Sequence, residues 1–222
     1  SMPKAAQAWV MLARAFQAND QPEEGTKAMK QSLAIEPNPQ INIELSRSLM
    51  ASKKWQAAID RLSVFPQDAT LRAEHQRLIG ACYFQLKDYA QAAASYQAAY
   101  DSQPNPKTLL SKVIALRSGG LSKDALSTLD QLTSHEKALP EIRFQRGQLL
   151  AEAGDMTGAA QAFTGYVQLA RGRNIEKSRL TSAQSWLLKY RQPQARPAPQ
   201  TPPLMPVKNT YQGAPSTVPS QR

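Results

Sequence analysis

Apolar side chains recur along most of this chain with the spacing of a helix. Ile79, Cys82, Tyr83 and Leu86, for example, stand at positions i, i+3, i+4 and i+7. This spacing places apolar side chains on one face of an α-helix, whereas a strand would alternate apolar and polar residues. No stretch of comparable length alternates in that way. The pattern predicts an all-helical chain.

The helical pattern repeats along the sequence. Ala92 has small equivalents at successive intervals of 33, 34, 33 and 34 residues, and a large apolar residue follows each of them four positions later. Twelve positions before each small residue comes Gly, Ala or Ser, with Val113 as the exception. Because antiparallel helices approach closely only where facing side chains are small, we expect Gly80 to contact Ala92. The small residues are Gly25, Ala58, Ala92, Ala125 and Ala159, and the large apolar residues four positions later are Met29, Leu62, Tyr96, Leu129 and Phe163. The residues twelve positions before the small ones are Ala13, Ser46, Gly80, Val113 and Gly147.

Short polar breaks divide each period into two helices, and prolines separate one period from the next. The breaks read NDQPEE, SKKW, LKDY, SGGLSKD and AGDMTG. The prolines lie in IEPNPQ and SQPNPK, where they cannot continue a helix and disfavour helical geometry at the residue before them. Because one helix pair cannot bury its apolar face alone, the sequence predicts a stacked array of pairs.

These residues resemble the tetratricopeptide repeat, a helix-turn-helix unit of about 34 residues. The resemblance covers residues 5–173 and implies an all-α, right-handed solenoid of five units, at about 6–39, 39–72, 73–106, 106–139 and 140–173. We expect Pro66 to shorten the second helix of unit two, and Lys112 and Val113 to depart from the pattern in unit four. The first unit matches with Trp9, Leu12, Ala13, Phe16, Gly25, Met29, Ser32 and Pro37, and the third with Gly80, Tyr83, Ala92, Tyr96, Ala99 and Pro104.

The resemblance also implies a function. The first helices of tetratricopeptide units line a concave groove that holds a protein or peptide, so we expect a non-catalytic scaffold. One arginine from each of the first four units would lie along this groove, interleaved with two phenylalanines. Arginine binds carboxylates with paired hydrogen bonds, so this pattern favours an extended, acidic peptide. The alternative is that these arginines are scattered, solvated charges. The expected groove residues are Arg14, Gln17, Arg47, Met50, Arg77, Phe84, Arg117, Phe144 and Gln148, with Gln7, Val10, Gln40, Ile43, Glu74, Lys107, Leu110 and Glu141 in the other inward slots.

The segment after residue 173 departs from the repeat. Leu180, Trp186 and Leu187 have helical periodicity, which predicts a helix over 174–191 that caps the last pair, with Asn174 as its N-cap. Residues 192–222 contain eight prolines and no acidic residue. Such a composition cannot bury enough apolar surface to offset the entropy of ordering, so we expect a mobile tail or linker.

The same end of the chain carries most of the net charge. Residues 171–222 contain 9 Lys and Arg against 1 acidic residue, whereas residues 1–170 contain 18 against 16. This excess raises an alternative function, the binding of an anionic polymer such as nucleic acid, polysaccharide or a lipid surface through 171–222. Aromatic residues are few in this segment, so a solubilising cap is the preferred interpretation and nucleic acid is not the expected partner.

No catalytic, metal or cofactor motif is present in the sequence. Cys82 lies in a strongly periodic segment and is expected to be a buried core residue. His75 and His135 have no Cys or His neighbour at metal-ligand spacing, and we expect both at the surface. Adjacent Glu23 and Glu24 lie in the first turn of a predicted helix, where its dipole favours negative charge. We therefore expect neither an enzyme nor a bound cofactor.

Localisation is weakly constrained. Ser1-Met2 is typical of an expression scar, no charged-then-apolar leader follows it, and the abrupt start inside a first repeat suggests a domain cut from a longer protein. No transmembrane segment is predicted, because the apolar runs fall far short of about 20 residues. The Gln- and Ala-rich helices are typical of bacterial proteins, and analogy with related arrays favours the periplasm and an envelope assembly, namely a pilus, secretion or exopolysaccharide export through the outer membrane. The cytoplasm is the alternative.

Overall fold

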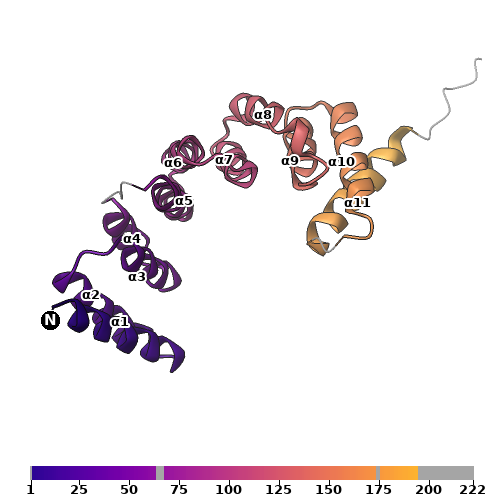
Figure 1. Ribbon diagram of the computed structural model, residues 1–222. Helices are drawn as coiled ribbons and strands as arrows, with labels where there is room; N and C mark the ends of the chain where they lie inside the picture. Colours follow the sequence, from indigo (N-terminus) through magenta and orange to yellow (C-terminus); the bar gives the residue numbers. More distant parts are fainter. Residues whose placement is uncertain (1, 64–67, 174–175, 195–222) are drawn as a thin grey trace, which may run out of the picture.

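The computed structural model describes residues 2–63, 68–173 and 176–194, and within these ranges the chain is all-helical, as predicted. The helices are α1 (Met2–Ala18), α2 (Pro22–Ile35), α3 (Pro39–Ala51), α4 (Trp55–Leu62), α5 (Ala69–Gln85), α6 (Tyr89–Ser102), α7 (Pro106–Ser118), α8 (Ser122–Asp130), the short 3-10 helix η1 (Thr133–His135), α9 (Glu141–Glu152), α10 (Met156–Ala170) and α11 (Lys177–Gln194). Consecutive helices pack as pairs along an arc, with α3, α5 and α7 on its inner side and α4, α6 and α8 on its outer side (Figure 1).

In two of the repeat units, an asparagine followed by a proline begins the first helix of the unit. Asn38 and Asn105 are the N-caps of α3 and α7, and a proline occupies the first turn after each. The side chain of Asn38 accepts hydrogen bonds from the backbone nitrogens of Gln40 at 2.9 Å and Ile41 at 3.2 Å. The cap satisfies amides that lack a helical partner, and proline loses nothing there because its position needs no N–H. The repeated PNP motif thus both ends one unit and starts the next.

The turn inside each unit contains one residue in the left-handed backbone region. These residues recur with the period of the repeat, and two are glycines while three carry side chains. A left-handed residue reverses the chain tightly enough for the two helices to lie antiparallel. The five are Asp20 (φ 58°), Lys53 (57°), Lys87 (63°), Gly120 (77°) and Gly154 (85°).

The predicted contact between small residues is confirmed. A Cβ added to Gly80 would lie 3.2 Å from the carbonyl oxygen of Ala92 and 3.0 Å from Cδ1 of Tyr96. Ala92 itself is fully buried. The bare backbone of α5 therefore packs directly on α6, which is why this slot of the repeat excludes most side chains.

The surface where one unit stacks on the next contains His75, and the expectation that His75 is a surface residue is wrong. Its side chain is fully buried, and Nδ1 lies 3.2 Å from the carbonyl oxygen of Leu62 at the end of α4. The equivalent positions in α3 and α9, Ile41 and Ile142, are also buried against the preceding unit. His135 is exposed, as expected, with Nδ1 3.0 Å from the hydroxyl of Ser134.

Units two and four differ from the others in their second helices. The eight-residue α4 ends at Leu62, in line with the expected shortening, and Pro66 lies outside the described residues. The nine-residue α8 is followed by η1, which the sequence pattern did not predict. Lys112 fits its usually apolar slot because Nζ donates to Oε1 of Gln97 on α6 at 2.7 Å.

The last pair is covered by α11. Trp186 packs its ring 5.0 Å from that of Phe163 on α10, and Leu180 and Leu187 join the same apolar cluster. The helix runs to Gln194, beyond the predicted end at residue 191. Asn174, proposed as N-cap, and residues 195–222 of the predicted tail lie outside the described residues.

Candidate binding surface

Ion pairs join the first helices of neighbouring units on the inner side of the arc. Nη2 of Arg14 on α1 donates to Oε1 of Glu44 on α3 at 2.8 Å, and Arg47 on α3 pairs with Glu74 on α5. Arg77 lies 3.8 Å from the same Glu74 carboxylate. The hydrogen bond that Arg14 donates to Glu44, together with the negative charge of Glu44, raises the pKa of the Arg14 guanidinium. Three of the arginines expected to bind an acidic peptide therefore already have carboxylate partners.

These pairs change the electrostatics of the surface more than its accessibility. The side chains of Arg14, Arg47 and Arg77 remain 59%, 53% and 48% exposed. A ligand can reach them, but its carboxylate would compete with Glu44 and Glu74. Exposed ion pairs contribute only about 0–1 kcal/mol, so such an exchange gives little net affinity. The N-terminal half of the surface is therefore nearly charge-balanced.

The aromatic anchors expected in the groove lie elsewhere. Phe144 is only 6% exposed, and its ring packs 5.8 Å from that of Phe163 and 5.2 Å from that of Tyr166. Phe84 is half-buried, with its ring 5.4 Å from Tyr89. The expectation of two exposed phenylalanines is wrong for Phe144, because α9 turns that position into the core shared with α10.

The remaining expected residues are dispersed. Ile43 and Leu110 are buried, whereas Gln17 is exposed near the end of α1. Met50 is half-buried against the core of the second and third units, and Gln148 is half-buried on α9. Nη1 of Arg117 lies 3.9 Å from Oε1 of Glu152, and the Arg117 side chain is only 21% exposed. Hence the nine residues do not form one continuous exposed patch.

A cavity of about 440 Å³ opens where α7, the start of α9 and the C-terminal segment meet. Lys107, Arg173 and Arg179 supply positive charge to its lining, and Glu141 supplies one negative charge. Arg179 pairs with Glu176 at 2.9 Å, while Nη1 of Arg173 donates to the backbone oxygen of Lys137 at 2.7 Å. The apolar part of the wall consists of Leu110, Ile114, Ala138, Leu139 and Pro140.

This cavity combines predicted and unpredicted residues. Lys107, Leu110 and Glu141 were expected at inward slots of their units. Arg173 and Arg179 were assigned only to the basic C-terminal segment, and nothing in the repeat pattern linked them to the groove. The charge excess after residue 170 was the available signal, and the fold brings Arg173, in the segment before α11, and Arg179 on α11 to the same cavity as residues of α7 and α9.

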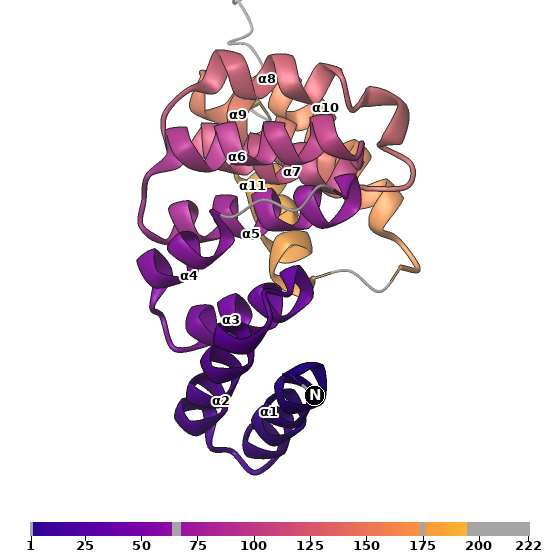
Figure 2. The ribbon, with the colours of Figure 1, turned by 60° about the vertical axis from the view of Figure 1, so that its left-hand side comes forward.

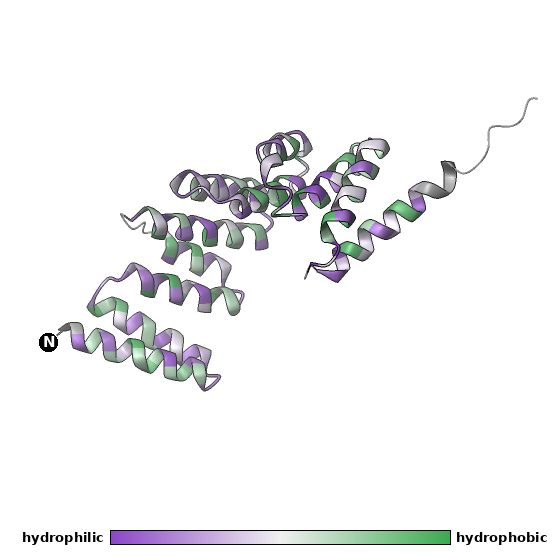
Figure 3. Ribbon diagram, turned by 45° about the vertical axis from the view of Figure 1, so that its right-hand side comes forward, coloured by the Kyte–Doolittle hydropathy of each residue, from purple (hydrophilic) through white to green (hydrophobic). Residues whose placement is uncertain are grey.

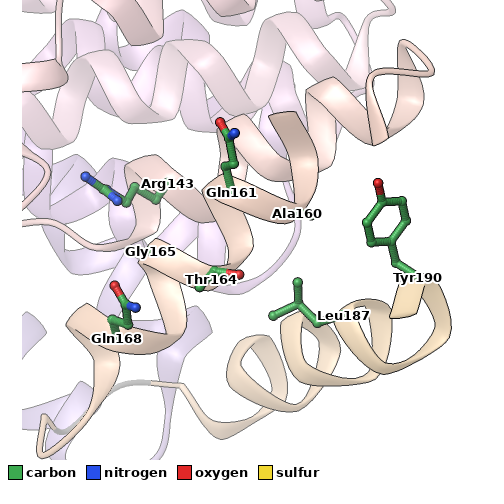
Figure 4. A pocket seen from close by; sticks show the side chains of 8 residues that line it. All are labelled: Arg143, Ala160, Gln161, Thr164, Gly165, Gln168, Leu187 and Tyr190. Atoms are coloured by element: carbon green, nitrogen blue, oxygen red, sulfur yellow. The ribbon is translucent and has the colours of Figure 1, made fainter. Parts of the chain in front are cut away.

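A second hollow of about 450 Å³ crosses the exposed face of α10 (Figure 4). Arg143 and Tyr190 lie on opposite sides of that helix in Figure 4, with Gln161 and Thr164 between them. Nε of Arg143 donates to Oε2 of Glu136 at 2.7 Å, and Gly165 leaves room for the guanidinium, which a Cβ there would strike. Its polar groups do not converge on one point, so this hollow is the weaker candidate.

The single cysteine of the chain lies in the interior. Cys82 is buried, as predicted, and burial raises the pKa of its thiol to about 11, which disfavours the reactive thiolate. Within the described ranges, no cluster of His, Cys, Asp or Glu could hold a metal ion. None of the described helices has the length and apolar character needed to cross a membrane.

The stacked helix pairs with a charged inner side define a helical-repeat protein. Tetratricopeptide repeat models match residues 6–39, 43–105 and 110–174, which is more than half of the chain, and the chain belongs to the tetratricopeptide repeat family. No curated protein matches its sequence.

Solved structures of similar fold are available at low sequence identity. A MamA protein superposes with a TM-score of 0.68 at 15% identity, covering 78% of this chain and 98% of its own. MamA of Desulfovibrio magneticus RS-1 gives 0.67 at 16% identity, covering 79% and 100%. PilF of Pseudomonas aeruginosa gives 0.58 at 20% identity, covering 88% and 83%. These likenesses establish the fold, a tetratricopeptide solenoid, and not a shared partner.

Proposed function

We propose that this protein is a non-catalytic scaffold that binds an extended segment of a partner protein along the inner side of its arc. Tetratricopeptide repeat proteins are in general interaction scaffolds. The observation that carries the proposal is the 440 Å³ cavity, where cationic side chains from three separate elements surround an apolar wall. Concave sites with a few convergent polar groups are the usual form of binding sites.

The chemistry of the cavity specifies the ligand. Lys107 and Arg173 have no carboxylate partner among the described residues, in contrast to Arg14 and Arg47. A glutamate or aspartate of the ligand would gain charge-assisted hydrogen bonds there without displacing an internal carboxylate. The neighbouring apolar wall would take a leucine-like side chain. The proposed ligand is therefore an acidic segment with an adjacent apolar residue, anchored at the C-terminal end of the groove.

Fluorescence anisotropy with a labelled peptide containing Glu-Leu-Glu-Leu between Gly-Ser spacers tests this proposal. We expect the double variant Lys107→Glu, Arg173→Glu to weaken binding at least about 10-fold, since two charge-assisted contacts become repulsive. Lys123→Glu, an exposed lysine of α8 outside the cavity, is the matched control and should bind as the parent chain does. Equal affinity for a Lys-Leu-Lys-Leu peptide, or no effect of the double variant, would contradict the proposal.

We further propose that the scaffold acts in the periplasm of a bacterium, in an envelope assembly such as a pilus, a secretion system or exopolysaccharide export through the outer membrane. The Gln- and Ala-rich helices support a bacterial origin, and the analogy with related arrays in envelope assemblies supports the periplasm. Osmotic-shock fractionation of the source cells, followed by immunoblotting, checks it. Recovery of the protein with a cytoplasmic marker enzyme would contradict it.

A second candidate function is the binding of an anionic polymer through the basic C-terminal segment. Arg171, Lys177 and Lys189 are exposed and have no carboxylate partner among the described residues, which favours this candidate. Binding of a labelled single-stranded oligonucleotide or of dextran sulfate should then weaken steeply with salt, and should be lost when all three are replaced by glutamate. Salt-independent binding that survives the triple replacement would exclude it.

A further inference from the structure

The connection between α8 and α9, residues 131–140, differs from the other connections between units. Residues 36–38 and 103–105 make the corresponding links from α2 to α3 and from α6 to α7, and both are shorter. Residues 131–140 contain η1 and then a series of turns, and Figure 2 shows them as an irregular stretch of chain. Leu132 is 1% exposed in the apolar core, and Leu139 packs against the same core, so both ends of this connection are anchored.

The middle of the connection is held by Glu136, through two arginines of α9. Hydrophilic residues, drawn purple in Figure 3, recur along the helices of the array, and on α9 they include Arg143 and Arg146. Nε of Arg143 donates to Oε2 of Glu136 at 2.7 Å, and Nε of Arg146 lies 3.9 Å from Oε1 of Glu136. The Glu136 side chain is only 13% exposed, whereas that of Glu44, in its pair with Arg14, is 23% exposed. Because a shielded charge is screened less by water and salt, Glu136 holds the connection more firmly than an exposed pair would.

The same connection forms one side of the 440 Å³ cavity. Residues 138–140 supply part of its apolar wall. The backbone oxygen of Lys137 accepts the 2.7 Å hydrogen bond from Nη1 of Arg173, which lines the cavity as one of its cations. Since Glu136 directly precedes these residues in the chain, its contact with α9 sets the position of both the apolar wall and the cation.

We infer that Glu136 is a positioning residue that gives this cavity its selectivity, an inference that rests on the proposed function. By fixing the connection, Glu136 sets the spacing between the Arg173 guanidinium and the wall at 138–140. The best ligand then has an acidic residue beside a bulky apolar one, because its carboxylate reaches Arg173 while its apolar side chain packs on the wall. Glu136 thus favours leucine over alanine beside the acid without touching the ligand.

The physical reason lies in how contact energy depends on fit. Dispersion contacts are lost steeply when a gap of about 0.5–1 Å opens between two surfaces. Without the Glu136 carboxylate, the connection stays anchored at Leu132 and Leu139 but loosens between them. A leucine of the ligand then packs on a wall that has moved, whereas an alanine hardly reaches the wall and loses little.

Fluorescence anisotropy with two labelled peptides, Glu-Leu-Glu-Leu and Glu-Ala-Glu-Ala between Gly-Ser spacers, tests this role. We expect the parent chain to bind the leucine peptide at least about 5-fold more tightly, since leucine buries more apolar surface. Glu136→Ala should reduce this preference to about 2-fold or less by weakening the leucine peptide. Glu136→Gln keeps the length of the side chain and one acceptor oxygen, and should retain an intermediate preference. Glu24→Ala, which removes the carboxylate that pairs with Lys27 on α2, is the matched control and should keep the full preference.

Hydrogen exchange followed by mass spectrometry measures the connection itself, without a ligand. In Glu136→Ala, the segment that contains the Leu139 amide, which donates to the His135 oxygen at 2.8 Å, should exchange faster, while α5 and α6 keep the parent rate. Arg143→Gln removes the same pair from the side of α9 and should show the same loss of preference. It replaces Glu136→Ala as the test if that variant exchanges faster throughout the chain.

The outcomes separate this role from the proposed function. A parent chain that binds neither peptide overturns both. A parent chain that binds both peptides with equal affinity overturns the role of Glu136 alone, and so does a preference for leucine that is unchanged in Glu136→Ala and in Arg143→Gln. Loss of the preference together with faster exchange confined to residues 131–140 supports it.

Discussion

Replacement of Gly147 by alanine tests the rule that small residues let the helices of a unit touch. Gly147 on α9 faces the ring of Phe163 on α10, and an added Cβ would lie 2.8 Å from Cδ1 and Cε1 and 3.0 Å from Cγ of that ring. Carbon atoms in favourable contact are about 3.5–4.0 Å apart. The ring or the helix must therefore move by roughly 1 Å.

The surroundings of Phe163 determine what this movement costs. The side chain is 3% exposed, with the ring of Phe144 at 5.8 Å and that of Trp186 at 5.0 Å, so the ring has no free space to enter. Overpacking of this kind costs about 1–3 kcal/mol. Alanine offsets part of it, because it favours a helix interior over glycine by about 1 kcal/mol. The net destabilisation lies in the range of roughly 0–2 kcal/mol, and we expect the upper end of it, with a weakened contact between α10 and α11, because the ring is enclosed.

Urea unfolding followed by tryptophan fluorescence measures the effect, because Trp186 reports on the affected cluster. The double variant Gly147→Ala, Phe163→Leu is the control for the mechanism. If the cost comes from the ring of Phe163, Gly147→Ala should destabilise the chain less when leucine replaces Phe163. The effects of the two substitutions on the free energy of unfolding should then not be additive. An unchanged or higher midpoint for Gly147→Ala, or full additivity of the two changes, would refute the reasoning.

Three further changes test other features. Gly154→Ala adds a side chain at φ 85° with nothing within 4 Å, so backbone strain alone should lower the stability by about 1 kcal/mol in urea unfolding. Burial raises the pKa of the Cys82 thiol from 9.0 to about 11, so the folded chain keeps this proton to higher pH than the unfolded chain does. The free energy of unfolding should therefore fall as pH rises from 9 to 11, and Cys82→Ala should remove this contribution to its pH dependence. Glu74→Gln deprives Arg47 and Arg77 of their shared carboxylate and should cost at most about 1 kcal/mol, with a smaller loss in high salt; a larger, salt-independent loss would contradict an exposed ion pair.

The architecture could be predicted because its signals are local. Asn38 and Pro39 begin a helix through contacts within one turn, and Gly80 and Ala92 permit a contact between neighbours in the chain. The Asn-Pro start recurs at α3 and α7 and the small residues recur at most of the contact positions, all with the period of the repeat, so weak indications reinforce one another. The residue type indicates a left-handed turn at Gly120, because it is a glycine. At Lys87 the residue type does not indicate one, and only the spacing of the repeat does.

The binding surface was predicted less well because its side chains meet across units. Arg14 and Glu44 are 30 residues apart, and Arg47 and Glu74 are 27 apart, so no local pattern shows that they pair. Phe144 occupies a slot that the family pattern directs inward, yet it lies in the core. The position of a residue within the repeat determines which face of the helix it occupies. How deeply that face is buried depends on how the helix is rotated against its neighbours.

The sequence by itself therefore determined the helices, their pairing and the order of the stack, because small residues, prolines and caps act over a few turns. Only the tertiary structure decided which charges are neutralised, that His75 is interior, and that Arg173 joins Lys107 at one cavity. It also showed which apolar side chains are exposed, such as Met11 and Leu12 of α1, because exposure depends on what packs against a helix and not on the helix alone.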